Sequence, residues 1–253
     1  MKKKNIKDLA IPRILSDDTP FAIREAFNLL RTNLMYTMSD NGEGAPVYAV
    51  TSTTESAGKS TVIVNLAISF AQLNKKVLIV DGDMRRPVIH NYLDIDSQNS
   101  GLSELISGIN NNVTIRDVRP NLDVITSGRI PPNPSELITS PRFEEYLNKW
   151  RQEYDIIFID FPPIGIVTDA IANCKLVNGY IFVIRSGRSN AKSINACIES
   201  MEQVGAKIAG IVLNDYNIKG SSAYHRSGSR YSKQSISKYE TAAKNNGNKS
   251  SDK

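Results

Sequence analysis

Short runs of consecutive apolar residues recur along the chain, separated by stretches whose apolar positions recur every three or four residues. The runs have the length of buried strands, and the longer stretches have the period of helices. They predict strands at residues 47–51, 76–81, 122–126, 155–160, 180–185 and 207–213. They predict helices at residues 21–38, 60–73, 141–153 and 189–204. Apolar strands that alternate with helices indicate an α/β fold, with a mostly parallel sheet and helices on both faces.

The first predicted helix, residues 21–38, is amphipathic. Apolar or small residues spaced three or four apart share one side of a helix. In this helix they are Ala22, Ala26, Leu29, Leu30, Asn33 and Leu34. We therefore expect this side of the helix to pack against the rest of the protein.

Composition places the chain among ordinary globular proteins. Its 253 residues are 40% hydrophobic and 23% charged, which excludes a wholly disordered or collagen-like chain. No apolar run approaches the roughly 20 residues that a membrane-spanning helix needs. The basic start, residues 1–7, is not followed by an apolar core, so no secretory signal is expected. Cys174 and Cys197 match no metal or redox spacing and are predicted to be buried thiols in a reducing compartment.

The C-terminal end of the chain differs from the rest. From residue 219 it holds nine serines, almost no aliphatic residues, and eight Lys or Arg against two acidic residues. Such a segment cannot bury enough apolar surface to offset its ordering entropy. We predict a disordered basic tail at residues 219–253, a loosely ordered N-terminal arm at residues 1–18, and one folded domain at residues 19–218. The net charge of +5 is concentrated in this tail, so no nucleic-acid partner is expected for the body.

A phosphate-binding loop follows the first predicted strand. Its sequence is Ser52-Thr-Thr-Glu-Ser-Ala-Gly-Lys-Ser-Thr61, and a predicted helix comes next. In such loops, backbone N–H groups and the helix N-terminus cradle phosphates, while Lys59 faces the β- and γ-phosphates and Ser60 faces Mg²⁺. The motif is degenerate, because Thr53 replaces the usual first glycine and Ser56 stands where a second glycine often helps. Taken alone, the loop leaves a chance Gly-Lys-Ser sequence open.

Aspartates at the ends of two other predicted strands favour the functional interpretation. Asp81 and Asp83 end the second strand, and Asp160 ends the fourth. Ligands of open α/β sheets bind at the carboxyl ends of the strands. Carboxylates there can hold Mg²⁺ directly or through water. The three motifs in this order therefore predict a nucleotide and Mg²⁺ site on a P-loop NTPase-type fold.

These motifs resemble those of the bacterial tyrosine kinases of capsule and exopolysaccharide synthesis, in the form whose cytosolic kinase is separate from its membrane adaptor. The likeness covers about residues 15–216, and two of its segments are specific to this family. They are Val80-Asp-Gly-Asp-Met-Arg-Arg-Pro87 and Pro131-Pro-Asn-Pro-Ser-Glu-Leu137. The other matching segments are residues 25–34, 57–61, 65–67, 101–105, 160–163, 168–170 and 212–214, which are shared with partitioning and division-site ATPases.

The resemblance implies an ATP-dependent protein-tyrosine autokinase with a P-loop kinase domain at residues 19–218. Implied catalytic residues are Lys59, Asp81, Asp83 and Asp160, and implied Mg²⁺ ligands are Ser60, Asp81 and Asp160. Implied nucleotide contacts are Thr54, Glu55, Ser56, Ala57, Gly58, Lys59, Ser60, Thr61, Arg85 and Asn214. Implied autophosphorylation sites are Tyr224, Tyr231 and Tyr239. Asp83 is favoured as the base that orients the tyrosine hydroxyl, and Arg85 or Arg86 could stabilise transferred charge or hold a partner subunit.

The resemblance also implies partners and a location. The expected partners are a membrane adaptor whose cytosolic end activates the kinase, a cognate tyrosine phosphatase and other copies of the chain in a ring. The ring motif of the family, Glu-x-x-Arg-x-x-Arg, reads Glu25, Asn28 and Arg31 here, so one intersubunit donor is missing. The expected location is peripheral, at the inner face of the plasma membrane. Two alternatives remain: an ATP-binding switch, and a pseudokinase scaffold that does not phosphorylate tyrosine.

Overall fold

The computed structural model describes residues 14–38, 44–95, 100–166 and 169–216. The chain divides into two units, Met1–Asn214 and Asp215–Lys253, and the fold below is that of the first. The predicted tail and its Tyr224, Tyr231 and Tyr239 lie outside the described residues, as do residues 1–13 of the predicted arm. Within the arm, Leu15 is buried, and its N–H donates to Asn65 Oδ1 at 2.6 Å. The predicted domain boundaries stay a prediction.

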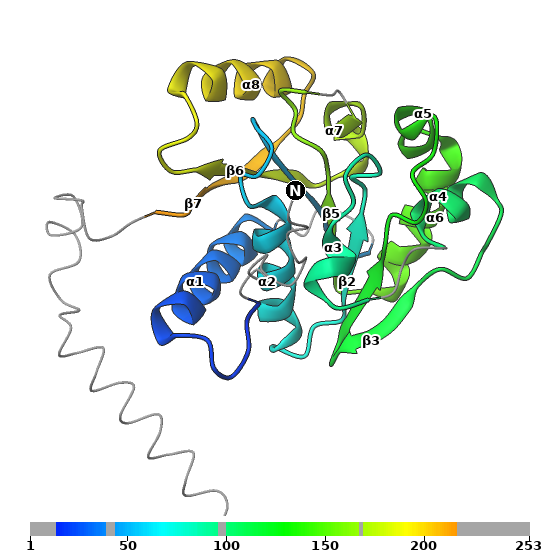
Figure 1. Cartoon of the computed structure of the whole chain (residues 1–253), viewed down its shortest axis with the longest axis horizontal. Helices are drawn as coiled ribbons and strands as arrows, with labels where there is room; N and C mark the ends of the chain where they lie inside the picture. The colour runs from blue at the N-terminus through cyan, green and yellow to red at the C-terminus, as the bar shows by residue number, and fades with distance from the viewer. Residues whose placement is uncertain (1–13, 39–43, 96–99, 167–168, 217–253) are drawn as a thin grey trace, which may run out of the picture. The chain divides into compact units, whose positions relative to one another are not determined.

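A seven-stranded sheet forms the centre of the first unit, in the order β3-β4-β2-β5-β1-β6-β7 (Figure 1). The strands are β1 Val47–Ser52, β2 Val77–Asp81, β3 Ile115–Arg119, β4 Leu122–Ile125, β5 Ile156–Asp160, β6 Gly179–Arg185 and β7 Ile208–Asn214. All neighbouring pairs are parallel except β3 with β4. The predicted mostly parallel α/β fold is confirmed, and β3 is an additional edge strand that its polar sequence did not predict.

The four predicted helices are present, and no boundary is shifted by more than two residues. They are α1 Phe21–Thr37, α2 Lys59–Ala71, α6 Pro141–Glu153 and α8 Ala191–Gln203. Shorter helices lie between them: α3 Ile89–Tyr92, α4 Leu102–Ser107, α5 Pro134–Ile138, α7 Asp169–Ala172 and the 3₁₀ turn η2 Cys174–Leu176. Local chemistry sets where α6 begins, because Ser140 Oγ accepts a hydrogen bond from the Phe143 N–H and a proline follows at the first helical position.

Apolar side chains of the strands pack into two separate hydrophobic cores, one on each face of the sheet. In β1, Val47 and Ala49 belong to one core, whereas Tyr48 and Val50 belong to the other, as the alternation of a strand requires. Helices α1 and α2 cover one face, and they lie together in Figure 1. Helices α4, α6 and α8 contribute to the core on the other face. This double cover explains why the strands read as continuous apolar runs.

The packed side of helix α1 shares only Leu30 and Leu34 with the side that the sequence predicted. Ala22, Ala26, Leu29 and Asn33 are exposed, and Leu29 retains 62% of its accessible surface. The packed side consists of Ile23, Phe27, Leu30, Leu34 and Met38. These side chains bury more apolar area than the two alanines, and that area decides which side of the helix faces the core.

Two further features of the described residues bear on the sequence predictions. Cys174 and Cys197 are free, as predicted, but only partly buried. Within the described ranges, no helix combines the length and the apolar character that crossing a bilayer requires.

Candidate active site

The phosphate loop joins β1 to α2. A side chain of β7, the strand at one edge of the sheet, holds its backbone. Gly58 has φ +93°, in the left-handed region. A Cβ atom at this position would lie 1.9 Å from Asn214 Nδ2. That amide nitrogen donates to the carbonyl oxygen of Ala57 at 2.9 Å. Both the backbone conformation and the lack of space therefore require glycine at position 58, and Asn214 at the end of β7 braces the loop.

The loop positions that depart from the usual motif differ in backbone conformation and in contacts. Ser56 has φ +56°, a conformation that glycine adopts at lower cost than serine. Its carbonyl oxygen accepts a hydrogen bond from Arg185 Nη1 at 3.0 Å. Arg185 lies at the end of β6 and was not among the predicted site residues. Glu55 forms an exposed ion pair with Arg86, so the loop is tied to the segment that follows β2.

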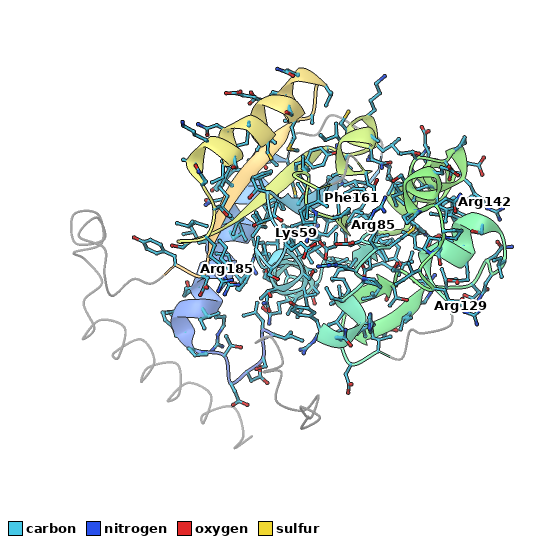
Figure 2. The ribbon with its side chains drawn as sticks, turned by 45° about the horizontal axis from the view of Figure 1, so that its top comes forward. Lys59, Arg85, Arg129, Arg142, Phe161 and Arg185 are labelled. Carbon is cyan, nitrogen blue, oxygen red and sulfur yellow. The ribbon has the colours of Figure 1, made fainter. Side chains whose placement is uncertain are left out.

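The predicted charged residues meet at the carboxyl ends of β2 and β5. Asp81 and Asp160 are direct neighbours in the register of these two parallel strands. Ser60 Oγ donates to Asp160 Oδ2 at 2.6 Å. Lys59 Nζ lies 4.0 Å from Asp83 Oδ2. All five side chains are buried, the most exposed being Lys59 at 8%, and Figure 2 shows Lys59 in the middle of the molecule.

Burial raises the pKa of each of the three carboxyl groups. For Asp160 the pKa reaches about 6, because the loss of solvent outweighs the stabilising charge of Lys59 and the Ser60 hydrogen bond. The pKa of Asp81 is raised well above its usual value by burial and by the neighbouring Asp160. The pKa of Asp83 is raised by burial, and the charge of Lys59 opposes this rise. Three carboxyl groups thus share one nearby lysine, and each binds a proton more tightly than an exposed aspartate does.

Two buried oxygen atoms point to what would complete the site. Asp81 Oδ1 and Asp160 Oδ1 have no hydrogen-bond partner. Buried carboxylate oxygens usually have a partner, and oxygen is the ligand that Mg²⁺ prefers. No group of three or more His, Cys, Asp or Glu in the described residues could hold a metal ion alone. The donor set therefore fits Mg²⁺ held jointly by the protein and by the phosphates of a nucleotide, as Mg²⁺ is commonly bound.

The structure adds residues that sequence reasoning did not select. Arg85 lies beside Asp169 and Ser135, which come from α7 and α5. The Tyr92 hydroxyl and Thr61 Oγ1 are 3.1 Å apart. Asp169 and Ser135 both fall in segments that carried the family resemblance, so that resemblance was the signal that could have found them. Tyr92 had no such signal.

The fold and this site define a class. A phosphate loop between a strand and a helix, with buried aspartates at the ends of neighbouring strands, marks a P-loop NTPase-type nucleotide-binding protein. In agreement, residues 47–209 match the AAA domain family.

Similar proteins narrow the class to a family. The chain is 37% identical to CapB of Staphylococcus aureus over 89% of this chain and 97% of that protein. It is 35% identical to tyrosine-protein kinase CpsD of Streptococcus agalactiae serotype III (strain NEM316), over 76% of this chain and 82% of CpsD. Its structure resembles the kinase domain of Escherichia coli tyrosine kinase ETK, with a TM-score of 0.74, 32% identity, and 86% and 88% of the two chains covered. The chain belongs to the bacterial tyrosine-protein kinases and is an enzyme of that type.

Proposed function

We propose that the site binds ATP with Mg²⁺ and transfers the γ-phosphoryl group to tyrosine hydroxyls. The observation that carries the proposal is the buried group of Lys59, Ser60, Asp81, Asp83 and Asp160 beside the phosphate loop. Phosphoryl transfer requires positioning and neutralisation of charge more than covalent chemistry by the protein. A buried lysine, a metal-binding hydroxyl and surplus carboxylates supply these two requirements.

The proposed roles follow from the position of each side chain. Lys59 faces the β- and γ-phosphates from the first turn of α2, where the helix N-terminus also favours negative charge. Ser60, Asp81 and Asp160 hold Mg²⁺, which would neutralise charge on the phosphates when bound. Residues 54–61 together with Asn214 surround the phosphates, and Arg85 contacts them from the segment after β2.

Asp83 is the proposed base for the acceptor tyrosine. It is 7% exposed, and it is paired with Lys59 but not with Ser60. Burial raises its pKa, and a carboxylate of raised pKa accepts a proton more readily than an ordinary one. Asp81 is better suited to the metal, because its Oδ2 already accepts from the Ile89 N–H and its Oδ1 has no partner.

The wider biological setting is proposed from the family. The acceptors include Tyr224, Tyr231 and Tyr239 of the kinase's own tail, and a cognate phosphatase removes the phosphate. The cytosolic end of a membrane adaptor recruits and activates the kinase at the inner face of the plasma membrane, where it regulates polymerisation and export of a capsular polysaccharide or exopolysaccharide.

Association into a ring would lack one contact. Asn28 Nδ2 donates to Glu25 Oε1 within the same helix at 2.8 Å. Arg31 Nη1 donates to the Ser69 carbonyl oxygen of α2 at 2.5 Å. All three side chains at the motif positions, Glu25, Asn28 and Arg31, are therefore engaged within one subunit. We propose that any ring is weaker than one built on the full motif.

A phosphotyrosine assay tests the proposed function. Purified protein is incubated with ATP, Mg²⁺ and a peptide from the cytosolic end of the adaptor, and both phosphotyrosine and ADP are measured. The proposal predicts phosphotyrosine that depends on Mg²⁺ and increases with the peptide. ADP formation without phosphotyrosine would favour the ATP-driven switch, and ATP binding without either product would favour the pseudokinase scaffold.

A further inference from the structure

The segment Pro131-Pro-Asn-Pro-Ser-Glu-Leu137 has no part in the reaction as proposed above. It enters and forms α5, where Pro134 occupies the first helical position. Asn133 Nδ2 donates to Glu136 Oε2 at 2.6 Å, which closes the first turn. Ser135 lies in this first turn, after Pro134.

Three side chains from distant parts of the chain form a closed cluster around Ser135, which we call the Arg85 cluster. Arg85 Nη2 donates to Ser135 Oγ at 2.8 Å, and Ser135 Oγ donates to Asp169 Oδ1 at 2.6 Å. Arg85 Nε completes the ring by donating to Asp169 Oδ2 at 3.3 Å. Each side chain thus contacts both of the others, and both carboxylate oxygens of Asp169 are engaged.

The segments that carry Arg85 and Asp169 are anchored in the body of the fold. Met84, beside Arg85, is 1% exposed and packs in the core. Asp169 is 4% exposed, and its carbonyl oxygen accepts from Asn173 Nδ2 at 2.9 Å. The Tyr180 hydroxyl donates to the carbonyl oxygen of Ala170, which anchors α7 to β6. The guanidinium of Arg85 is therefore held between α5 and α7, and its own segment is anchored in the core by Met84.

The cluster leaves part of this guanidinium available. Arginine has five N–H donors, and these two contacts use the Nε and Nη2 groups. The Arg85 side chain keeps 40% of its surface exposed, and it lies two positions after Asp83. Figure 2 shows Arg85 in the same central region as Lys59. Arg86 differs, because 70% of its side chain is exposed and its partner is the exposed Glu55.

We propose that Ser135 and Asp169 are positioning residues that hold Arg85 as a rigid contact for the phosphoryl group during transfer. The inference rests on the proposed function and adds a role for the Pro-Pro-Asn-Pro-Ser-Glu-Leu segment. A planar guanidinium binds phosphate oxygens in a fixed geometry, and its effect on the rate depends on how well that geometry is maintained. Ser135 and Asp169 act only through Arg85.

A double-mutant cycle with Arg85→Ala and Ser135→Ala tests this dependence. The kcat and the KM for ATP are measured for tyrosine phosphorylation, together with the melting temperature of each variant. Ser135→Ala should lower kcat about tenfold with little change in KM, and Arg85→Ala should lower it at least as much. In the Arg85→Ala background, Ser135→Ala should cause no further loss, because the residue it positions is absent.

Further variants separate positioning from a structural role. Ser135→Thr keeps the hydroxyl and should restore most of the rate, whereas Asp169→Asn should resemble Ser135→Ala. Ser107→Ala, an exposed serine at the end of α4, is the matched control and should leave kcat unchanged. Effects of Arg85→Ala and Ser135→Ala that multiply, or a wild-type kcat in Ser135→Ala, would overturn the inference.

Failure of the positioning role can be told apart from failure of the proposed tyrosine phosphorylation. If the wild-type protein releases ADP but forms no phosphotyrosine, tyrosine transfer is wrong. The same cycle is then measured on ATP hydrolysis, where the transferred phosphoryl group carries the same charge. A non-additive cycle there would still support the positioning role, and an additive one would reject it. If Ser135→Ala does not fold, the cycle is run with Asp169→Asn in its place.

Discussion

At the scale of single residues, burial gives ordinary side chains their special properties. Asp160 is 1% exposed and lies next to Asp81 across the β2–β5 pair, with Lys59 as the nearby positive charge. A solvent-exposed aspartate is almost fully deprotonated near neutral pH. The buried carboxylates therefore destabilise the nucleotide-free protein, and a bound cation would relieve this cost.

The first prediction concerns the pH dependence of stability through Asp160. The folded-state pKa of about 6 lies above the model-compound value of 3.8, so the folded chain binds the proton more tightly. The contribution of this proton to stability is full below the lower value and is lost as the pH rises through about 6. Asp160→Asn should therefore raise the stability of the nucleotide-free protein at about pH 7.5, by about 1 to 3 kcal/mol.

Thermal unfolding at two pH values measures this effect. At about pH 3, below both pKa values, the gain should nearly vanish, because the wild-type carboxyl is then mostly protonated in the folded and the unfolded state. A variant less stable than wild type at the higher pH would contradict the burial cost assigned to Asp160.

The second prediction concerns Gly58. Gly58→Ala places a Cβ within 1.9 Å of Asn214 Nδ2 at a φ of +93°. Stability should fall by about 1 to 3 kcal/mol, and ATP affinity should be lost because the phosphate loop must move. Gly205→Ala is the control for strain alone, since its φ is +79° and nothing lies within 4 Å of its added Cβ. Calorimetry of ATP binding to both variants checks the prediction, and equal ATP affinities would refute it.

At the scale of elements, the shortest helices carry more of the site than their length suggests. The Ile89 N–H at the start of α3 donates to Asp81 Oδ2 at 3.2 Å, and Tyr92 at its end contacts Thr61 of α2. Helix α3 therefore links Asp81 at the end of β2 to the start of α2, directly after the phosphate loop. Helices α5 and α7 do the same for Arg85. A short helix thus holds Asp81 in the first case, and two short helices hold Arg85 in the second.

The third prediction tests the link through α3. Tyr92→Phe removes the hydroxyl that contacts Thr61 Oγ1 but keeps the ring. Stability should fall by about 1 kcal/mol, the usual value of one hydrogen bond, and the KM for ATP should rise a few-fold because Thr61 follows Ser60. Tyr36→Phe is the control, since Tyr36 is 86% exposed. The same KM for ATP in Tyr92→Phe and wild type would show that α3 does not support the loop.

The sequence predicts those elements whose pattern of apolar and polar residues is visible within one segment of the chain. The long apolar strands and amphipathic helices are local patterns, and they were predicted. Strand β3, Ile115–Arg119, is a partly exposed edge with three charged residues, so it carries no apolar run. Helices of four to six residues, such as α3 and α4, are too short to show a helical period. The motifs located Lys59 and the aspartates, but the meeting of Arg85, Ser135 and Asp169 depends on tertiary folding, which no local pattern encodes.

At the scale of the whole molecule, the proposed function assigns phosphoryl transfer to residues 19–218 and the acceptor tyrosines to residues 219–253. The sequence motifs, the fold and the family membership all indicate that the folded domain is a kinase. The tail was predicted from composition alone, and its tyrosines lie outside the described residues. Tyr224 is ten residues beyond Asn214, a separation that a flexible chain would span with a typical reach of under about 20 Å. Transfer between molecules is therefore the expected route.

The fourth prediction follows from this geometry. Full-length Lys59→Met protein is mixed with an otherwise wild-type chain truncated after residue 219, and phosphorylated peptides are mapped by mass spectrometry. Phosphate should appear on Tyr224, Tyr231 or Tyr239 of the inactive partner. Each phosphate of about −1.5 to −2 charge would also shift the basic tail toward neutrality. Phosphate found only on body tyrosines such as Tyr36 would reject the tail as acceptor.

The most direct test of the central claim compares wild type, Lys59→Met and Lys75→Met for phosphotyrosine formed from γ-labelled ATP. Lys75 is a half-exposed lysine that pairs with Asp155, just before β5 and thus at the edge of the sheet opposite the site. Wild type and Lys75→Met should accumulate labelled phosphotyrosine, and Lys59→Met should form none while remaining folded, because the phosphate-facing charge is lost. Phosphotyrosine at the wild-type level in a folded Lys59→Met variant would contradict the account.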